Sequence, residues 1–296
     1  MSINKMPFGK VGVITDEVGQ DFLEAVKFID QIGIRYIEIH SLWGKTVESL
    51  SQSEVKKVIK IVKNHNLEVS NLAPTIFFLS SVSSDEKIPE PPNSNFLAIR
   101  GTIEDHLSSL KKCAEIGRKL GTNKIRLFGF RKQGQLSDEK RDRIVRAMTK
   151  AKKIAESYDL ILLLENCPYT YLNPATATQK MLRKMDCPNI ELLWDPGNSF
   201  KSNINPYPDE YSKIKKDIGH IHLKNRIKNE RDQTYEYRSL KEGKIDYFPL
   251  LKELAEGRYE GVISLEPELQ VEGSSKLGVK KVFNELEEYA KKLATN

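Results

Sequence analysis

Short apolar, β-branched runs alternate with longer stretches of helical periodicity along the whole chain. Eight such pairs can be counted, with strands expected at residues 11–15, 36–40, 67–72, 124–130, 160–165, 190–195, 220–224 and 262–266. Between them, apolar residues recur three and four positions apart, as in helices that cover a sheet. This alternation of strands and helices predicts βαβ units and a parallel sheet.

The expected strand at 160–165 is apolar on both faces until its last residue, Glu165. Because side chains alternate along a strand, one face packs against helices while the other fills the interior of a closed barrel. A chain of 296 residues suits one α/β barrel. The sequence therefore predicts the α/β class and a (β/α)8 TIM barrel, as a single domain over residues 1–296.

Four of the expected strands end in residues that can bind a divalent metal. They are Glu165, Asp195, His222 and Glu266. Two connections, 74–100 and 225–244, are long and polar, and we expect both to be loops that follow strands. In a parallel barrel the C-terminal ends of the strands meet at one rim, which carries the active site. The pattern therefore predicts one metal centre at that rim.

Three carboxylates and one imidazole form a hard, oxygen-rich ligand set, which suits Mn²⁺, Mg²⁺ or Co²⁺ and also accepts Zn²⁺. A cation of this kind stabilises the enediolate that forms when a carbon next to a carbonyl loses a proton. Glu165 and Glu266 come from the fifth and eighth strands, so they are candidate catalytic acid/base groups on opposite faces of a substrate carbon. Epimerisation needs both faces, whereas aldose–ketose isomerisation can use one.

Other residues near the strand ends are candidate substrate contacts. Lys224 and Arg226 follow the metal-type histidine and can neutralise a phosphate or carboxylate, unless they belong to a flexible basic loop. His40 ends the second strand and is either a substrate contact or structural. Trp43 follows it, and its ring can pack on the C–H face of a sugar or on the loop itself.

Two inward-facing residues lie deeper in the expected barrel. By strand parity His220 lies one layer below the metal-type histidine, where we expect it to be hydrogen-bonded to its neighbours. Glu38 faces inward from the second strand, either as a satisfied core carboxylate or as a partner that orients a metal ligand.

Four segments, LLLEN, LLWDPGN, GHIHLKN and EGKIDYFPLLKELAEGRYEGVISLEPE, resemble the xylose isomerase-like TIM barrel superfamily of sugar phosphate isomerases and epimerases. The resemblance covers residues 8–290 and implies metal ligands at Glu165, Asp195, His222 and Glu266. In the epimerases of this family, residues matching the two glutamates are the acid/base pair. The resemblance thus implies the metal site that the strand ends predict.

The resemblance also bears on the substrate. Many family members have Asp-x-x-His on the sixth strand, where the histidine contacts substrate, and Asn198 is the corresponding candidate here. Ketose 3-epimerases of the family have a further glutamate at the position of Tyr171, which argues against a free ketohexose as substrate.

We therefore expect a metal-dependent isomerase or epimerase that acts on a small sugar or sugar phosphate. A dehydratase of the inosose or dehydroshikimate type is the alternative on the same scaffold, and loss of one water from the substrate would distinguish it. An apurinic-endonuclease-like phosphodiesterase is less favoured, because five histidines are too few for its cluster of metals. A binding protein with a degenerate site is disfavoured because all four metal-type residues are present.

Composition narrows the partners and the compartment. Hydrophobic residues make up 39% and charged residues 30%, and the net charge of +6 is spread over helical segments, so no nucleic-acid surface is expected. No apolar run is long enough to span a membrane, and the N-terminus lacks a signal core. Three cysteines without CxxC spacing favour a reducing, cytoplasmic setting. Because members of the family are often dimers or tetramers, the resemblance also implies a homo-oligomer.

Overall fold

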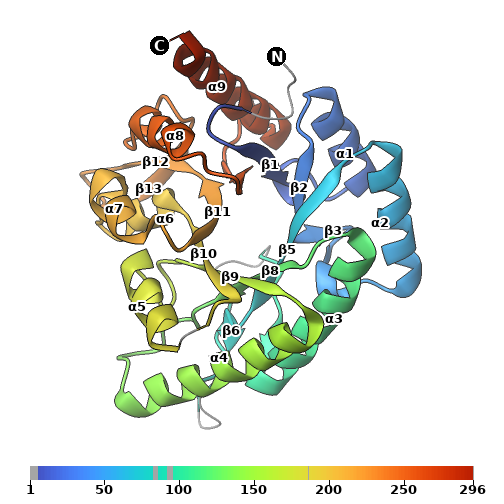
Figure 1. The fold of residues 1–296 in the computed structure, drawn as a ribbon, viewed down its shortest axis with the longest axis vertical. Coiled ribbons are helices and arrows are strands. Elements are labelled where there is room, and N and C mark those ends of the chain that lie inside the picture. Colours follow the sequence, from blue (N-terminus) through green and yellow to red (C-terminus); the bar gives the residue numbers. More distant parts are fainter. Residues whose placement is uncertain (1–5, 83–85, 92–95, 186, 296) are drawn as a thin grey trace.

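The computed structural model describes residues 6–82, 86–91, 96–185 and 187–295. Eight parallel strands close into a barrel in the order β1-β14-β11-β10-β9-β8-β5-β2, which confirms the predicted (β/α)8 barrel (Figure 1). The barrel strands are β1 (Lys10–Ile14), β2 (Tyr36–Ile39), β5 (Glu68–Ile76), β8 (Lys124–Phe128), β9 (Ile161–Glu165), β10 (Ile190–Trp194), β11 (Ile218–Leu223) and β14 (Val262–Leu265). All eight match strands predicted from the apolar runs.

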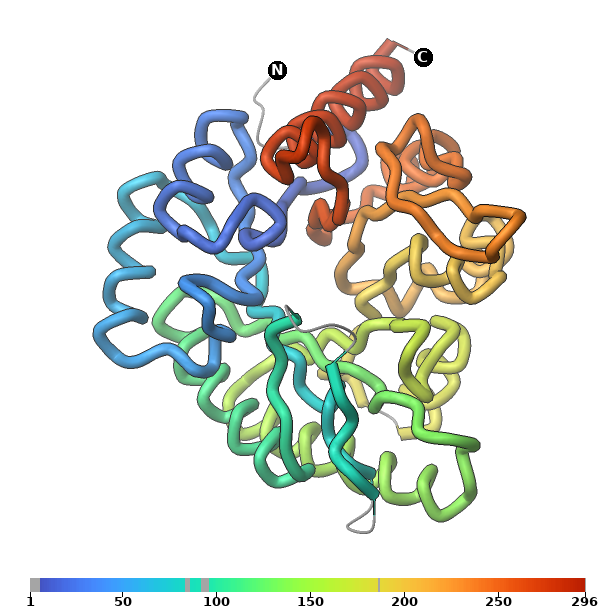
Figure 2. Tube along the Cα trace, turned by 180° about the vertical axis from the view of Figure 1, so that it is seen from behind, coloured from blue at the N-terminus to red at the C-terminus, as the bar shows by residue number. Residues whose placement is uncertain are grey.

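Helices surround the barrel, as Figure 1 shows. They are α1 (Phe22–Gln31), α2 (Gln52–Asn64), α3 (Ile103–Leu120), α4 (Asp138–Tyr158), α5 (Ala175–Met185), α6 (Pro196–Lys201), α7 (Tyr211–Ile214), α8 (Tyr247–Glu256) and α9 (Ser275–Thr295). Short helical turns lie at η1 (Thr15–Glu17), η2 (Val47–Ser49) and η3 (Pro206–Glu210). Seen from behind in Figure 2, the chain circles the barrel once, and α9 returns beside the N-terminal strand and η1.

The main hydrophobic core lies between the barrel and the helices. On β9, Leu162 and Leu164 belong to this core, whereas Leu163 and Glu165 alternate with them and face the interior of the barrel. On the helix side, α1 contributes Phe22, Val26 and Ile29 on one stripe, and α9 is buried along its own apolar stripe in the same way. The strands are thus fixed from outside, which leaves their inward residues free to carry polar groups.

Short extra strands decorate the C-terminal rim of the barrel. They are β3 (Ser41–Leu42) with β4 (Lys45–Thr46), β6 (Leu79–Ser80) with β7 (Arg100–Gly101), and β12 (Asn225–Lys228) with β13 (Tyr235–Arg238). The expectation of a plain loop over 225–244 was wrong, because β12 and β13 form an antiparallel hairpin there. The sequence did not indicate these strands, because Tyr235 and Tyr237, which favour strands, alternate with the charged residues Glu236 and Arg238.

In the described part of the chain, no helix is both long and apolar enough to cross a membrane.

Candidate metal centre

The four metal-type residues converge at the C-terminal mouth of the barrel. Glu165 ends β9, Asp195 follows β10, His222 lies in β11 and Glu266 follows β14. One ligand atom from each lies within 4.8 Å of all the others. The first three side chains are almost completely buried and Glu266 is 15% exposed. The structure therefore brings together the set of residues that the strand ends predicted.

The polar atoms at this point fit a divalent cation. Asp195 Oδ2, His222 Nδ1 and Glu266 Oε2 are buried close together, and Lys224 Nζ is the cation beside the two carboxylate oxygens. Three carboxylates buried at one point are costly in free energy, and a divalent cation would offset their charge. Carboxylate oxygens with one imidazole nitrogen are suitable ligands for Mg²⁺, Mn²⁺ and Co²⁺ and for Zn²⁺.

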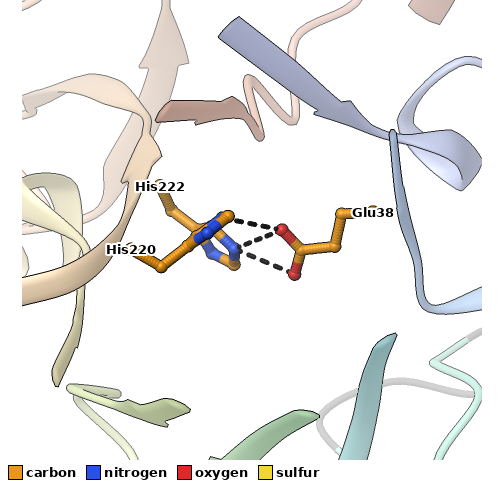
Figure 3. A group of neighbouring side chains, drawn as sticks. All are labelled: Glu38, His220 and His222. Atoms are coloured by element: carbon orange, nitrogen blue, oxygen red, sulfur yellow. Dashed lines mark hydrogen bonds and ion pairs between the residues drawn. The ribbon is translucent and has the colours of Figure 1, made fainter. Parts of the chain in front are cut away.

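Glu38 fixes the orientation of the histidine ligand (Figure 3). Both of its carboxylate oxygens lie 3.1 Å from His222 Nε2, while His222 Nδ1 lies 3.2 Å from Glu266 Oε2. Nε2 therefore donates a proton to Glu38, which turns Nδ1 toward Glu266. This is the carboxylate–histidine arrangement that orients metal-binding imidazoles. The structure therefore supports the second interpretation of Glu38, in which its carboxylate orients the metal-type histidine His222.

His220 completes this support below the site. Its Nε2 lies 3.1 Å from Glu38 Oε2 and 2.9 Å from Ser264 Oγ, as expected for a hydrogen-bonded residue of the barrel interior. Burial alone raises the pKa of Glu38, but the charges and hydrogen bonds of the two histidines outweigh it and hold the pKa well below its usual range. Glu38 is therefore a carboxylate that can accept from both rings.

We expect Glu38→Gln to weaken divalent-metal binding by about 10- to 100-fold, because the neutral amide no longer holds His222 in its ligand orientation. Isothermal titration with Mn²⁺ or Mg²⁺ measures the change. Glu210→Gln is the matched control, since Glu210 is equally buried but accepts from Trp194 Nε1 at 3.0 Å and does not line the cavity at the mouth. Equal metal affinity in the two variants would show that Glu38 does not position the ligand.

Glu165 is held on two sides. Arg126 Nη1 donates to its Oε2 at 3.2 Å, and Asn198 Nδ2 donates to its Oε1 at 3.1 Å. Burial, with a contribution from the Glu266 carboxylate, raises the pKa of Glu165 to about 7 even though Arg126 opposes it. Burial also raises the pKa of Glu266, but Lys224 and His222 outweigh that effect and hold it below its usual range. The two carboxylates thus have different environments.

The Asp-Pro-Gly-Asn turn places Asn198 at the site. Asp195 caps the N-terminus of α6 by accepting from the Asn198 N–H at 3.0 Å, and Pro196 occupies the first helical turn. Asn166 fixes the backbone of Asp195 by donating to its carbonyl at 3.0 Å and accepting from its N–H at 2.8 Å. One side chain oxygen of Asp195 is therefore used for capping, while the other faces the metal-type residues.

Lys224 lies among the carboxylates. Its Nζ is 3.2 Å from Asp195 Oδ2, 2.7 Å from Glu266 Oε2 and 2.7 Å from Glu268 Oε1. Although burial lowers the pKa of Lys224, these carboxylates raise it well above its ordinary value. Its positive charge is thus already compensated by the protein.

A cavity of about 330 Å³, a size that suits a small molecule, opens at this point and is lined by Glu165 and Glu266 of the four metal-type residues. Four of the candidate substrate contacts line it, namely His40, Asn198, Lys224 and Arg226. His40 Nδ1 donates to the Ala73 carbonyl at 3.0 Å, which leaves Nε2 without that proton.

Two other sequence positions lie away from this cavity. Trp43 does not line it, because the left-handed turn at this residue (φ 52°) carries the ring outward, where it packs edge-on against Phe22 and beneath Lys57. Tyr171 is also absent from the lining, since its hydroxyl donates to the Gln133 carbonyl at 2.7 Å.

Sequence reasoning missed Arg126, Glu268 and Tyr237, all of which line the cavity. The sequence could have indicated Arg126, because alternation along β8 places it on the same inward face as Phe128. Glu268 lies two residues after Glu266, so alternation along an extended chain would place both on the same face. No sequence pattern indicated Tyr237, because its position depends on the pairing of β12 with β13.

A model of the family described as xylose isomerase-like TIM barrel matches residues 26–289. The chain belongs to this family. Among curated proteins it is 23% identical over 208 residues to 3-dehydroshikimate dehydratase from Bacillus anthracis, a match that covers 69% of this chain and 66% of the relative's length.

Two solved structures have a fold similar to that of this chain. A xylose isomerase-like TIM barrel protein from Mycobacterium smegmatis in complex with magnesium has a TM-score of 0.71 at 16% identity, covering 99% of both chains. The 3-keto-D-glucoside 4-epimerase from E. coli has a TM-score of 0.69 at 15% identity, covering 93% of this chain and 98% of that one. At these identities the likeness establishes the fold.

Proposed function

We propose that this protein is a divalent-metal-dependent sugar or sugar-phosphate isomerase or epimerase that removes a proton from a carbon next to a carbonyl. The observation that carries the proposal is the convergence of four ligand atoms within 4.8 Å at the mouth of the barrel, beside a cavity of small-molecule size. Enzymes of the isomerase, epimerase and dehydratase kind occur in its family, which supports this class of chemistry.

Glu165, Asp195, His222 and Glu266 would hold the cation. When bound, it supplies Lewis-acid stabilisation of negative charge on the substrate oxygens. Its identity is proposed as Mn²⁺, Mg²⁺ or Co²⁺, with Zn²⁺ also compatible, and the magnesium complex of a similar fold supports a hard divalent ion.

Glu165 and Glu266 are the proposed acid/base residues. Strands β10 and β11 separate β9 from β14 in the barrel, so the two carboxylates reach the cavity from different directions. One can take a proton from one face of the substrate carbon while the other returns a proton to the opposite face. Arg126 and Asn198 hold Glu165 by hydrogen bonds, and this fixes the direction in which its oxygens point.

A dehydratase is the second candidate, and the match to 3-dehydroshikimate dehydratase favours it. Its first step is the same proton removal, after which the β-hydroxyl leaves as water. The glutamic acid formed by that proton removal can supply the proton that the leaving hydroxyl needs. His40 lines the cavity with Nδ1 donating to the Ala73 carbonyl, so its Nε2 can accept a hydrogen bond from a substrate hydroxyl.

Product analysis with a panel of ketoses, ketose phosphates and 3-dehydroshikimate tests the proposal. Metal-dependent formation of an isomeric product supports the isomerase or epimerase, whereas a product lighter by one water supports the dehydratase. The absence of metal-dependent conversion across the panel, in protein shown to bind metal, would count against both.

The three cysteines, Cys113, Cys167 and Cys187, are buried. They support a proposed reducing, cytoplasmic location. A small-molecule partner, without nucleic acid or membrane, and a homo-oligomeric state remain part of the proposal.

A further inference from the structure

Arg226 is a buried guanidinium that lines the cavity without a carboxylate partner. Only 2% of its surface is exposed, and among the described residues it forms no ion pair and no side-chain hydrogen bond. Its Nε is buried and unpartnered in the same sense. Because a buried charge is costly unless it is paired, an anionic group of a ligand in the cavity would be stabilised at this position.

The other buried cations of the cavity differ in this respect. Arg126 lies 3.2 Å from Glu165, and Lys224 contacts three carboxylates. Lys201 also lines the cavity, but it is partly exposed, so water can solvate its charge. Among the described lining residues, Arg226 is therefore the buried cation that makes no direct ion pair with a carboxylate.

An aromatic ring holds the guanidinium in place. Arg226 and Tyr237 are directly opposite each other in the β12–β13 hairpin, and Arg226 Cζ lies 4.8 Å from the centre of the Tyr237 ring. Stacking on a ring engages the face of a guanidinium and leaves its N–H edges free for a planar or tetrahedral oxyanion. Tyr237 lines the same cavity.

The base of the hairpin is rigid. Asn225 donates to the carbonyls of Leu240 and Ile245 at 2.9 Å each, and it accepts from the Arg226 N–H at 2.9 Å. The Lys244 N–H donates to the Arg226 carbonyl at 3.0 Å. A Cβ at Gly243 would collide with the Asn225 amide, so close packing fixes this junction. The guanidinium is thus preorganised before a ligand arrives.

We propose that Arg226, stacked on Tyr237, is an anion-binding subsite for a carboxylate or phosphate group of the substrate. This inference rests on the proposed function and narrows it, since the carbonyl compound that reaches the metal-type residues must then be acidic. Glu165 and Glu266 line the same cavity of about 330 Å³ as Arg226 and Tyr237, so one small molecule can contact both sides.

The binding test uses metal-free protein, so that anions cannot bind to a metal. Titration calorimetry with inorganic phosphate and, separately, with malonate should show binding to the wild type, and the tighter of the two names the preferred group. Arg226→Gln should weaken that binding about 10- to 100-fold, since a charge-assisted hydrogen-bonding partner is lost. Arg226→Lys, which keeps the charge without the planar fork, should fall between them.

Arg238→Gln is the matched control. Arg238 lies on the opposite strand of the same hairpin and pairs with Glu236 at 2.5 Å, outside the cavity lining. This variant should bind both anions like the wild type. If the wild type binds neither anion, or if Arg226→Gln and Arg238→Gln bind them equally, the subsite is rejected. If the wild type binds neither anion, the subsite is rejected even when an Arg226 variant fails to fold.

Kinetics separate this inference from the proposed function. With an acidic substrate, Arg226→Gln should raise KM much more than it lowers kcat, because the contact is made in both the ground state and the transition state. Efficient metal-dependent turnover of a neutral sugar, unchanged in Arg226→Gln, would overturn the subsite and leave the function standing. Anion binding that depends on Arg226, without turnover of any panel compound, would support the subsite while rejecting the function.

Discussion

Glu165→Gln and Glu266→Gln are each expected to lower kcat by about 10²- to 10⁴-fold while the protein retains most of its bound metal. Glutamine keeps an oxygen that can coordinate a cation weakly, but it cannot accept or return a proton. If the two glutamates act only as ligands, activity and metal occupancy should fall in parallel. Measuring kcat together with metal content by elemental analysis, on the same preparations, therefore separates proton transfer from coordination.

Exchange of the substrate C–H with deuterated solvent reports the proton-removal step directly. The wild type should incorporate deuterium into product, and the two glutamine variants should lose exchange together with turnover. Glu191→Gln is the control, because Glu191 lies at the start of β10, at the opposite end of the barrel, and pairs with Lys124 at 3.6 Å. Full activity in both site variants at full metal loading would eliminate these glutamates as acid/base catalysts.

The sequence was sufficient to predict the barrel and the convergence of four residues, for a physical reason. Parallel strands bring their C-terminal ends to one rim, so a metal-type residue at the end of each of four strands needs little tertiary information to be placed. Strand parity was enough for Glu38 and His220 too, because a residue on β2 or β11 faces either the helices or the interior. The hydrogen bonds between them follow from that shared interior.

Features of the rim depend on backbone turns that periodicity does not encode. The left-handed conformation at Trp43 turns its ring away from the cavity, and it belongs to the two-residue turn with Gly44 that joins β3 and β4. The 225–244 hairpin was hidden by its charges. Consequently the sequence alone could not predict that Arg226 stacks on Tyr237 or that its guanidinium is buried.

A divalent cation is expected to stabilise the wild-type protein strongly. At a free concentration about 100 times the Kd, binding to the folded state adds about 2.7 kcal/mol to the free energy of unfolding. For a domain of 296 residues that corresponds to a rise in Tm of roughly 4 °C. Differential scanning calorimetry of chelator-treated, dialysed protein, with Mn²⁺, Mg²⁺, Co²⁺ or Zn²⁺ added back in turn, measures the rise and ranks the metals.

Asp195→Asn should reduce that rise, because the variant replaces a charged ligand by a weakly coordinating amide oxygen, while an amide oxygen can still accept the capping hydrogen bond from the Asn198 N–H. Asp217→Asn is the control, since Asp217 pairs with Arg183 at 3.1 Å and lies just before β11, away from the mouth. It should keep the full metal-dependent rise. A wild-type Tm that none of the four cations changes would mean that the convergent carboxylates do not form a metal site. Lys224, which contacts two of them, would then be the charge that holds them together.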